Sequence, residues 1–203
     1  MSETSMATKG RREITRADIL PLAEYGKKRG EYRNQVLAVK RHRRVEVGPV
    51  ATFYFESYET MWQQIHEMLW IEKGGEAQID DELRAYNPLI PKGRELVATV
   101  MFEIDDPLRR KHFLSRLGGV EETAFLRFAG ETVKGVPEAD VERTSAEGKA
   151  SSVQFIHFPF TAEQIAKFRA PGTEVVLGFS HENYGHMAML PDAVREALAA
   201  DFD

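Results

Sequence analysis

The hydrophobic pattern of this chain changes its period near residue 94, and this change limits the fold more than any other feature. Upstream, six apolar residues between positions 57 and 73 recur three or four positions apart and would share one helix face: Tyr58, Met61, Trp62, Ile65, Met68 and Leu69. Downstream, apolar residues alternate as in a strand: Leu96, Ala98, Val100, Phe102 and Ile104. We therefore expect one α+β domain over residues 13–203, with a helical subregion at 13–93 and a sheet-rich subregion at 94–203, after a disordered extension at 1–12.

The sheet-rich subregion has a definite order of predicted elements. Between residues 94 and 180 this order is β-α-β-β-α-β, which can form a ferredoxin-like sheet with helices on one face. Two hairpins are also predicted, one at residues 45–55 around Gly48 and Pro49 and one at residues 174–190. The expected result is a mixed, mainly antiparallel sheet on which helices pack, preceded by the N-terminal helical segment.

The composition excludes several classes of protein. The 203 residues include no cysteine, which excludes disulfides, thiol nucleophiles and iron–sulfur clusters ligated by cysteine. No apolar run reaches the ~20 residues of a membrane span. The N-terminus also lacks the apolar core of a signal peptide. We therefore expect a cytoplasmic protein that does not bind a membrane.

A first candidate site lies beside the apolar face of the predicted helix at 57–73. Spacings of four, three and four place four residues there in one stripe: Glu59, Gln63, His66 and Trp70. Gln63 and His66 are similar to the Glu-x-x-His pair that supplies ligands in di-iron helix bundles, although an amide is a poor ligand for iron. The alternative, which we favour, is that these residues border the core and bond to a neighbouring segment.

A second candidate site is the predicted turn of the hairpin at 174–190. If residues 182–185 form a four-residue turn, His181 and His186 become a cross-strand pair with Cβ atoms within ~5.5 Å. Two imidazoles can hold a divalent metal if a third ligand joins them, and the candidates for it are His157, Glu59 and His66. Tyr184 in the turn could orient a bound group or act as an acid. The alternative, which base rates favour, is a structural turn whose imidazoles bond to backbone carbonyls.

Positive charge is concentrated in the first quarter of the chain. Residues 1–50 contain 12 Lys or Arg and 6 Asp or Glu, whereas the remaining residues contain 15 and 26. The basic residues peak in a short cluster around His42: Lys40, Arg41, Arg43 and Arg44. Such a cluster can bind an anionic partner, but the absence of interleaved aromatic residues argues against nucleic acid. A solvated helix C-terminus, where cations interact favourably with the helix dipole, is the explanation that we favour.

Five segments carry a family resemblance: EITRADILPLAEY (13–25), VLAVKRHRRVEVGP (36–49), QQIHEML (63–69), AYNPLIPKGRELVATVMFE (85–103) and HENYGH (181–186). Together they are specific, and the chain resembles domain-of-unknown-function family 3501 over nearly all of residues 13–202. Members of that family often carry Gln at the position of His66, which weakens a metal role for this residue. The paired histidines around Tyr184 follow the family pattern more closely.

The resemblance implies a context but no reaction. Genes of the family tend to lie beside those of rubrerythrin-like di-iron proteins and of iron–sulfur oxidoreductases of the heterodisulfide-reductase type. A chain without cysteine would serve there as an accessory or partner protein, docking through the basic cluster near Lys40. The alternative is a small metal-binding protein or metal-dependent enzyme that uses the histidine hairpin. Whether the chain is an enzyme, which cofactor it takes and whether it forms homo-oligomers stay open at this point.

Overall fold

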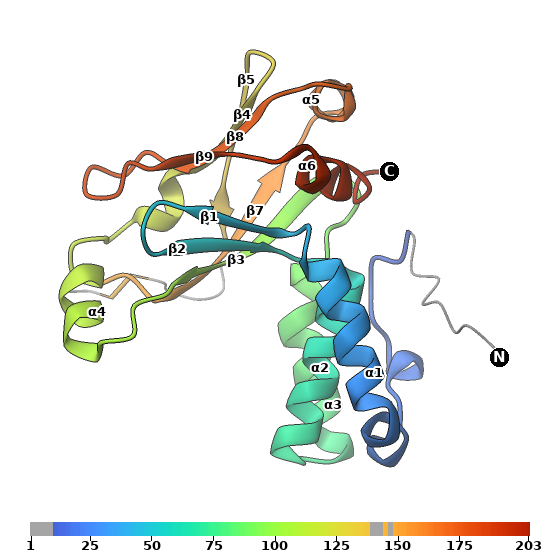
Figure 1. Ribbon diagram of the computed structural model, residues 1–203. Helices are drawn as coiled ribbons and strands as arrows, with labels where there is room; N and C mark the ends of the chain where they lie inside the picture. Colours follow the sequence, from blue (N-terminus) through green and yellow to red (C-terminus); the bar gives the residue numbers. More distant parts are fainter. Residues whose placement is uncertain (1–9, 139–143, 146–147) are drawn as a thin grey trace.

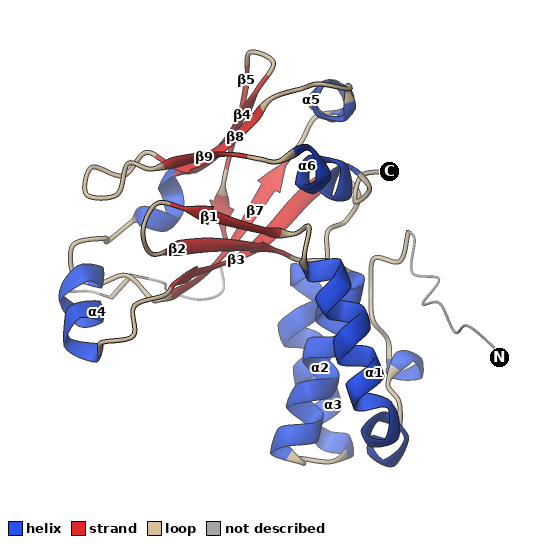
Figure 2. Ribbon diagram, in the orientation of Figure 1, coloured by secondary structure: helices blue, strands red, loops and turns tan. Residues whose placement is uncertain are grey.

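The computed structural model describes residues 10–138, 144–145 and 148–203. Three helices stand side by side at one end of the molecule, and two β-sheets with shorter helices form the other end (Figures 1 and 2). The long helices are α1 (Leu22–Lys40), α2 (Tyr58–Glu72) and α3 (Glu76–Tyr86), and two short 3-10 turns, η1 (Arg16–Asp18) and η2 (Asn87–Leu89), flank them in the sequence. The predicted α+β class is confirmed.

All strand pairs in the two sheets are antiparallel. The first sheet has the order β1 (Arg44–Val47), β2 (Ala51–Phe55), β3 (Glu95–Phe102), β7 (Val153–Pro159) and β6 (Val136–Pro137). The second has the order β5 (Glu131–Lys134), β4 (Ala124–Phe128), β8 (Val175–Phe179) and β9 (Met187–Met189). The remaining helical elements are α4 (Pro107–Leu114), η3 (Val120–Thr123), α5 (Ala162–Arg169) and α6 (Asp192–Ala199).

The predicted ferredoxin-like arrangement of residues 94–180 is wrong. The predicted elements occur in the predicted order, but β3 and β7 pair in the first sheet while β4 and β8 pair in the second. The β3–β7 pair is also antiparallel, with Ala98 opposite Ile156. Strands β1 and β2 occupy the other edge of β3, so the sheet that β3 joins comes partly from the N-terminal half.

The main core lies between the two sheets. Alternation along β2 and β3 turns Phe53, Phe55 and Ala98 inward, where they join Leu177 and Phe179 of β8 in one buried cluster. A second, smaller core binds the long helices together around fully buried Tyr25 and Ile65. Because β3 contributes Val97 to this second core, its outer face is the surface on which the helices stand.

Helix α2 lies within the predicted range of residues 57–73. The Ser57 side chain caps its N-terminus by accepting the backbone N–H of Thr60. Its C-terminal cap is Lys73 in the left-handed conformation (φ 56°), directly before Gly74 and Gly75. The apolar face is buried as predicted except for Met68, which is partly exposed.

The N-terminal segment runs along the helices before α1 begins. The predicted disorder of residues 1–9 lies outside the described residues. Arg11 and Arg12, which we assigned to the same extension, bond to Asp18 and Asp203 respectively. None of the helices in the described ranges combines the length and apolarity that a bilayer crossing requires.

Candidate functional site

His66, the imidazole of the predicted helix stripe, is fully buried in α2. Its Nδ1 lies 2.7 Å from the carbonyl oxygen of Trp62, and its Nε2 accepts the backbone N–H of Leu20 at 3.0 Å. This pattern fits the neutral imidazole with its proton on Nδ1. Burial lowers the pKa of His66, which favours the same form. His66 therefore bonds to the segment before α1 and keeps no nitrogen free for a metal.

The other members of the stripe do not converge on a common site. Trp70 packs on Gly26 of α1 and lies 5.8 Å from the guanidinium of Arg29. Glu59 accepts the Ser57 hydroxyl at 2.7 Å at the first turn of the helix, while Gln63 is half-buried. Of these three residues, Trp70 thus contributes to the contact between α1 and α2.

The expected cross-strand pairing of His181 with His186 is wrong, because the turn is tighter than four residues. His181 bridges to Tyr184, whose backbone N–H donates to the His181 carbonyl at 3.0 Å. The carbonyl of His186 instead accepts the backbone N–H of Phe179 at 2.9 Å. The two imidazoles therefore occupy different positions of the hairpin.

The contacts of these imidazoles are structural. His181 accepts the backbone N–H of Asn183 on Nδ1 and has its Nε2 3.2 Å from the carbonyl oxygen of Gly118. The exposed ring of His186 rests against the ring of Tyr184, with centroids 4.5 Å apart. The Tyr184 hydroxyl is buried and contacts the β1–β2 turn, where it donates to the carbonyl of Val47 at 2.7 Å.

The proposed third metal ligands lie elsewhere. His157 is on the outer face of the first sheet between two carboxylates, with Nδ1 3.0 Å from Glu95 and Nε2 2.7 Å from Glu138. Within the described part of the chain, no group of three His, Cys, Asp or Glu side chains could hold a metal ion. The histidine hairpin thus has no visible third ligand among these residues.

The predicted basic cluster does not form one surface patch. Arg43 is buried and forms two hydrogen bonds with Asp201, at 2.8 and 2.5 Å. Arg44 is exposed, lies over the Tyr54 ring and pairs with Glu46. The prediction that Arg43 is a solvated cation is wrong, because its carboxylate partner Asp201 lies 158 residues further along the chain and nothing in the local sequence indicates it.

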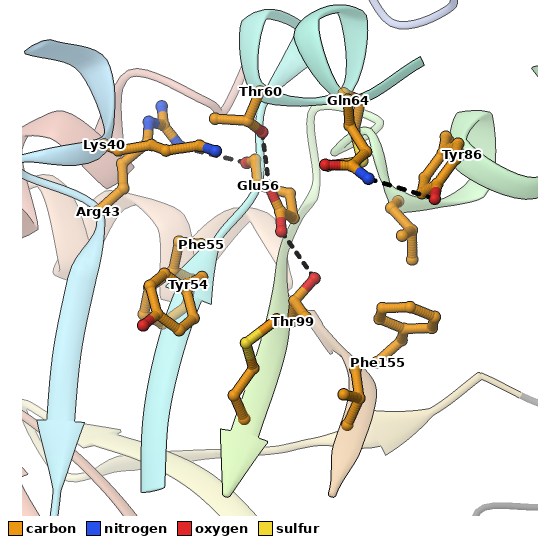
Figure 3. Close-up of a pocket in the computed structure, with 14 residues that line it drawn as sticks. Lys40, Arg43, Tyr54, Phe55, Glu56, Thr60, Gln64, Tyr86, Thr99 and Phe155 are labelled. Carbon is orange, nitrogen blue, oxygen red and sulfur yellow. Dashed lines mark hydrogen bonds between the residues drawn. The ribbon is translucent and has the colours of Figure 1, made fainter. Parts of the chain in front are cut away.

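The outer face of the first sheet and the long helices enclose a pocket of about 460 Å³, which we call the Glu56 pocket (Figure 3). Strands β2, β3 and β7 supply one side of it, α2, α3 and η2 another, and the C-terminal end of α1 a third. Much of its lining is apolar and includes Met61, Leu89, Met101, Val153 and Phe155. Polar groups from Lys40, Gln64 and Tyr86 also reach it.

A buried carboxyl group lies at the centre of this pocket. Glu56 follows β2 directly, where strand alternation turns its side chain away from the inter-sheet core. Its two carboxyl oxygens each bond to a threonine hydroxyl at 2.6 Å, Thr60 on α2 and Thr99 on β3. Figure 3 shows the carboxyl group between these two hydroxyls, with the amino group of Lys40 on one side.

The surroundings of Glu56 favour its neutral form. Burial raises the pKa of the Glu56 carboxyl, although the two hydroxyls and the positive charges of Lys40 and Arg43 act in the opposite direction. The hydrogen bonds suit both states, since Thr60 can also direct its hydroxyl to the Ser57 carbonyl at 3.1 Å and then accept from a protonated carboxyl. A carboxyl that stays buried beside a cavity with adaptable partners can bind a ligand or transfer a proton.

Sequence reasoning missed this site, although one signal was present. The alternation at 52–56 places a carboxylate on the outer face of a hairpin, directly before the Ser57 cap of a helix. An exposed hairpin face is an ordinary place for a glutamate. Only the packing of the helices against this face buries it.

The comparisons with known proteins agree with the fold and assign no activity. A crystal structure from Burkholderia pseudomallei at 1.90 Å resolution, described as a novel protein of unknown function, is similar to this chain with a TM-score of 0.86. The two share 37% sequence identity over 94% of this chain and 99% of that one. No curated protein matches the sequence. The family described as "Protein of unknown function (DUF3501)" matches residues 13–202, so the chain belongs to this family.

Proposed function

We propose that this protein binds a small, partly apolar molecule in the Glu56 pocket. The observation that carries the proposal is a buried carboxyl group facing a cavity of about 460 Å³ with a largely apolar lining. This volume falls within the range of small-molecule sites, which combine apolar walls with a few convergent polar groups. The protein would thus be a ligand-binding protein, and the bound molecule would lie beside the carboxyl group of Glu56.

The energetics of Glu56 support a role beyond packing. Placing a carboxyl group in a low-dielectric site is unfavourable unless its hydrogen bonds are fully replaced. The two threonine hydroxyls supply one bond to each oxygen, which stabilises the group without neutralising a charge. A structural role, tying β2 to α2 and β3, would need no adjacent cavity, and the cavity is what favours binding.

A dye-binding experiment tests the proposal. The fluorescent probe 1-anilinonaphthalene-8-sulfonate should bind the folded protein, and Met101→Trp should remove most of the signal because the larger side chain fills the pocket from β3. Met187→Trp is the matched control, since Met187 is also an exposed strand methionine but lies on β9 outside the pocket. Equal dye binding by both variants and the unmodified protein would overturn the proposal.

A partner role in a redox context is a second candidate, and one observation favours the docking of another protein. Strand β9 is an edge of the second sheet and exposes two methionines, Met187 and Met189, at 61% and 59%. Methionine side chains adapt to varied apolar partners, so two exposed ones on one strand offer a surface for docking. Rubrerythrin-like and iron–sulfur oxidoreductase proteins are the partners to test by co-purification. Binding that Met187→Glu and Met189→Glu leave unchanged would exclude β9 as the docking site.

A further inference from the structure

We infer that the Glu56 pocket takes an amphipathic acid, a molecule with an apolar chain and one carboxylate head that pairs with Lys40. This inference rests on the proposed function, because it names the ligand class of the same pocket. It is carried by three features of the wall: the hydrogen-bond partners of its charged side chains, the position of Lys40, and the apolar surface beside it.

The charged side chains of the wall differ in whether they already have partners. Arg43 donates to both carboxyl oxygens of Asp201 and to the carbonyl of Glu56, so its donors are directed at groups of the protein. Glu56 has a hydroxyl on each oxygen. Lys40 lines the pocket, and its side-chain ammonium group forms no hydrogen bond or salt bridge with any residue that the structure describes. Its ammonium group is thus the charge left for a ligand.

The position of Lys40 gives the bound molecule a direction. Lys40 is the last residue of α1 and is half-buried, and Figure 3 shows its side chain reaching toward Glu56 from the side opposite Gln64 and Tyr86. The space between these ends is bordered by Met101 and Phe155. A carboxylate at Lys40 would therefore extend an apolar chain along these side chains.

The chemistry of Glu56 favours an anion over a cation at this place. An amine would need Glu56 to be ionised, whereas burial disfavours its charge. A protonated Glu56 can keep both threonine bonds and leaves the charge of Lys40 unopposed. A ligand carboxylate that enters the pocket further favours the protonated form of Glu56, because two adjacent anions in one site are unfavourable. Binding of the acid therefore requires Glu56 in its protonated form and weakens as the pH rises through the pKa of Glu56.

The other groups around Glu56 do not reverse this sign. Arg43 lies between α1 and β1 and is paired with Asp201 beyond α6, so the two charges offset each other. Glu59 on α2 acts on both members of this pair, Arg43 and Asp201. From β3 the facing group is the neutral hydroxyl of Thr99.

Three eight-carbon probes with the same chain and different heads test the inference by titration calorimetry: octanoate, octanol and octylamine. We expect octanoate to bind roughly tenfold or more tightly than octanol, the gain typical of a hydrogen bond to a charged group, and octylamine to bind weakest. Lys40→Met should reduce octanoate to the affinity of octanol. Lys28→Met, an exposed lysine on the same helix, is the control and should change neither.

The outcomes separate this inference from the proposed function. If octanoate and octanol bind equally, the proposal that the pocket binds a ligand is supported, but the inference that it prefers a carboxylate head is wrong. If octylamine binds tightest, Glu56 is the charged partner and the inference is overturned. If none of the three binds the folded protein, both proposals fail for this ligand class. Glu56→Gln tests the protonation step: it should retain octanoate binding and lose its pH dependence, and a folded variant whose affinity still falls with pH would contradict that step.

Discussion

Arg43 and Asp201 form a buried ion pair that joins the start of the first sheet to the end of the chain. Their side chains are 9% and 10% exposed, and Nη1 and Nη2 of the arginine lie 2.8 and 2.5 Å from Oδ2 and Oδ1 of the aspartate. The same guanidinium also donates to the carbonyl of Glu56 at 3.2 Å. The pair therefore fixes the backbone from which the pocket carboxyl projects.

Replacing Arg43 alone should destabilise the fold strongly. Arg43→Met leaves Asp201 as an uncompensated buried charge, and we expect a loss of about 3 to 5 kcal/mol in the free energy of unfolding. Urea denaturation followed by circular dichroism measures it. The control is Arg44→Met, which removes an exposed pair with Glu46 and should cost no more than about 1 kcal/mol. Similar losses in the two variants would contradict the role assigned to the buried pair.

Features set by short-range spacing could be predicted from the sequence. The helix at 57–73 was recognisable because its apolar residues recur three or four positions apart within one short stretch. The hairpin at 45–55 was recognisable because alternation meets a turn at Gly48, where φ is +71°. In both cases residues close together in the sequence determine the secondary structure, and the packing of the fold does not change it.

Features set by long-range pairing could not be predicted in this way. The alternation of β3 is compatible with either sheet, and its actual neighbours β2 and β7 lie in distant parts of the sequence. Arg43 resembled a surface cation because nothing near it in the sequence indicates Asp201. Glu56 resembled a solvated strand residue because only the helices bury it. The missed site is therefore the place where two separately predictable parts of the chain meet.

Tyr184 ties the tip of the C-terminal hairpin to the β1–β2 turn, and its hydroxyl should matter for stability. The buried oxygen accepts the backbone N–H of Ala51 at 3.0 Å and donates to the carbonyl of Val47 at 2.7 Å. Tyr184→Phe leaves both groups without this partner and should cost about 1 to 3 kcal/mol. Thermal or urea unfolding checks this value. Tyr54→Phe, whose exposed hydroxyl bonds to Glu103, is the comparison and should change stability by less than about 0.5 kcal/mol.

His66 should make the fold less stable in acid. Burial lowers its pKa in the native state, so in the window below the ordinary value of about 6.5 the unfolded chain binds more protons than the folded one. The free energy of unfolding therefore falls as the pH decreases through this window. His66→Gln, which can still accept from Leu20, should flatten that dependence between about pH 7 and 5. An unchanged slope, with exposed His112→Gln as the reference, would mean that His66 is not the group responsible.

His157 should have the opposite effect on the pH dependence of stability. Its hydrogen bond to Glu95, and secondarily that to Glu138, raises the pKa of the imidazole against the effect of burial. A group whose native pKa is raised stabilises the fold fully below its unfolded value of about 6.5, and this contribution is lost as the pH rises through the raised native value. His157→Gln should therefore destabilise the protein near pH 6 and have much less effect near pH 9. His157 on β7 contacts the carboxylates of Glu95 on β3 and Glu138 after β6. A larger loss of stability at high pH than at low pH would show that the charged imidazole is not what holds these strands together.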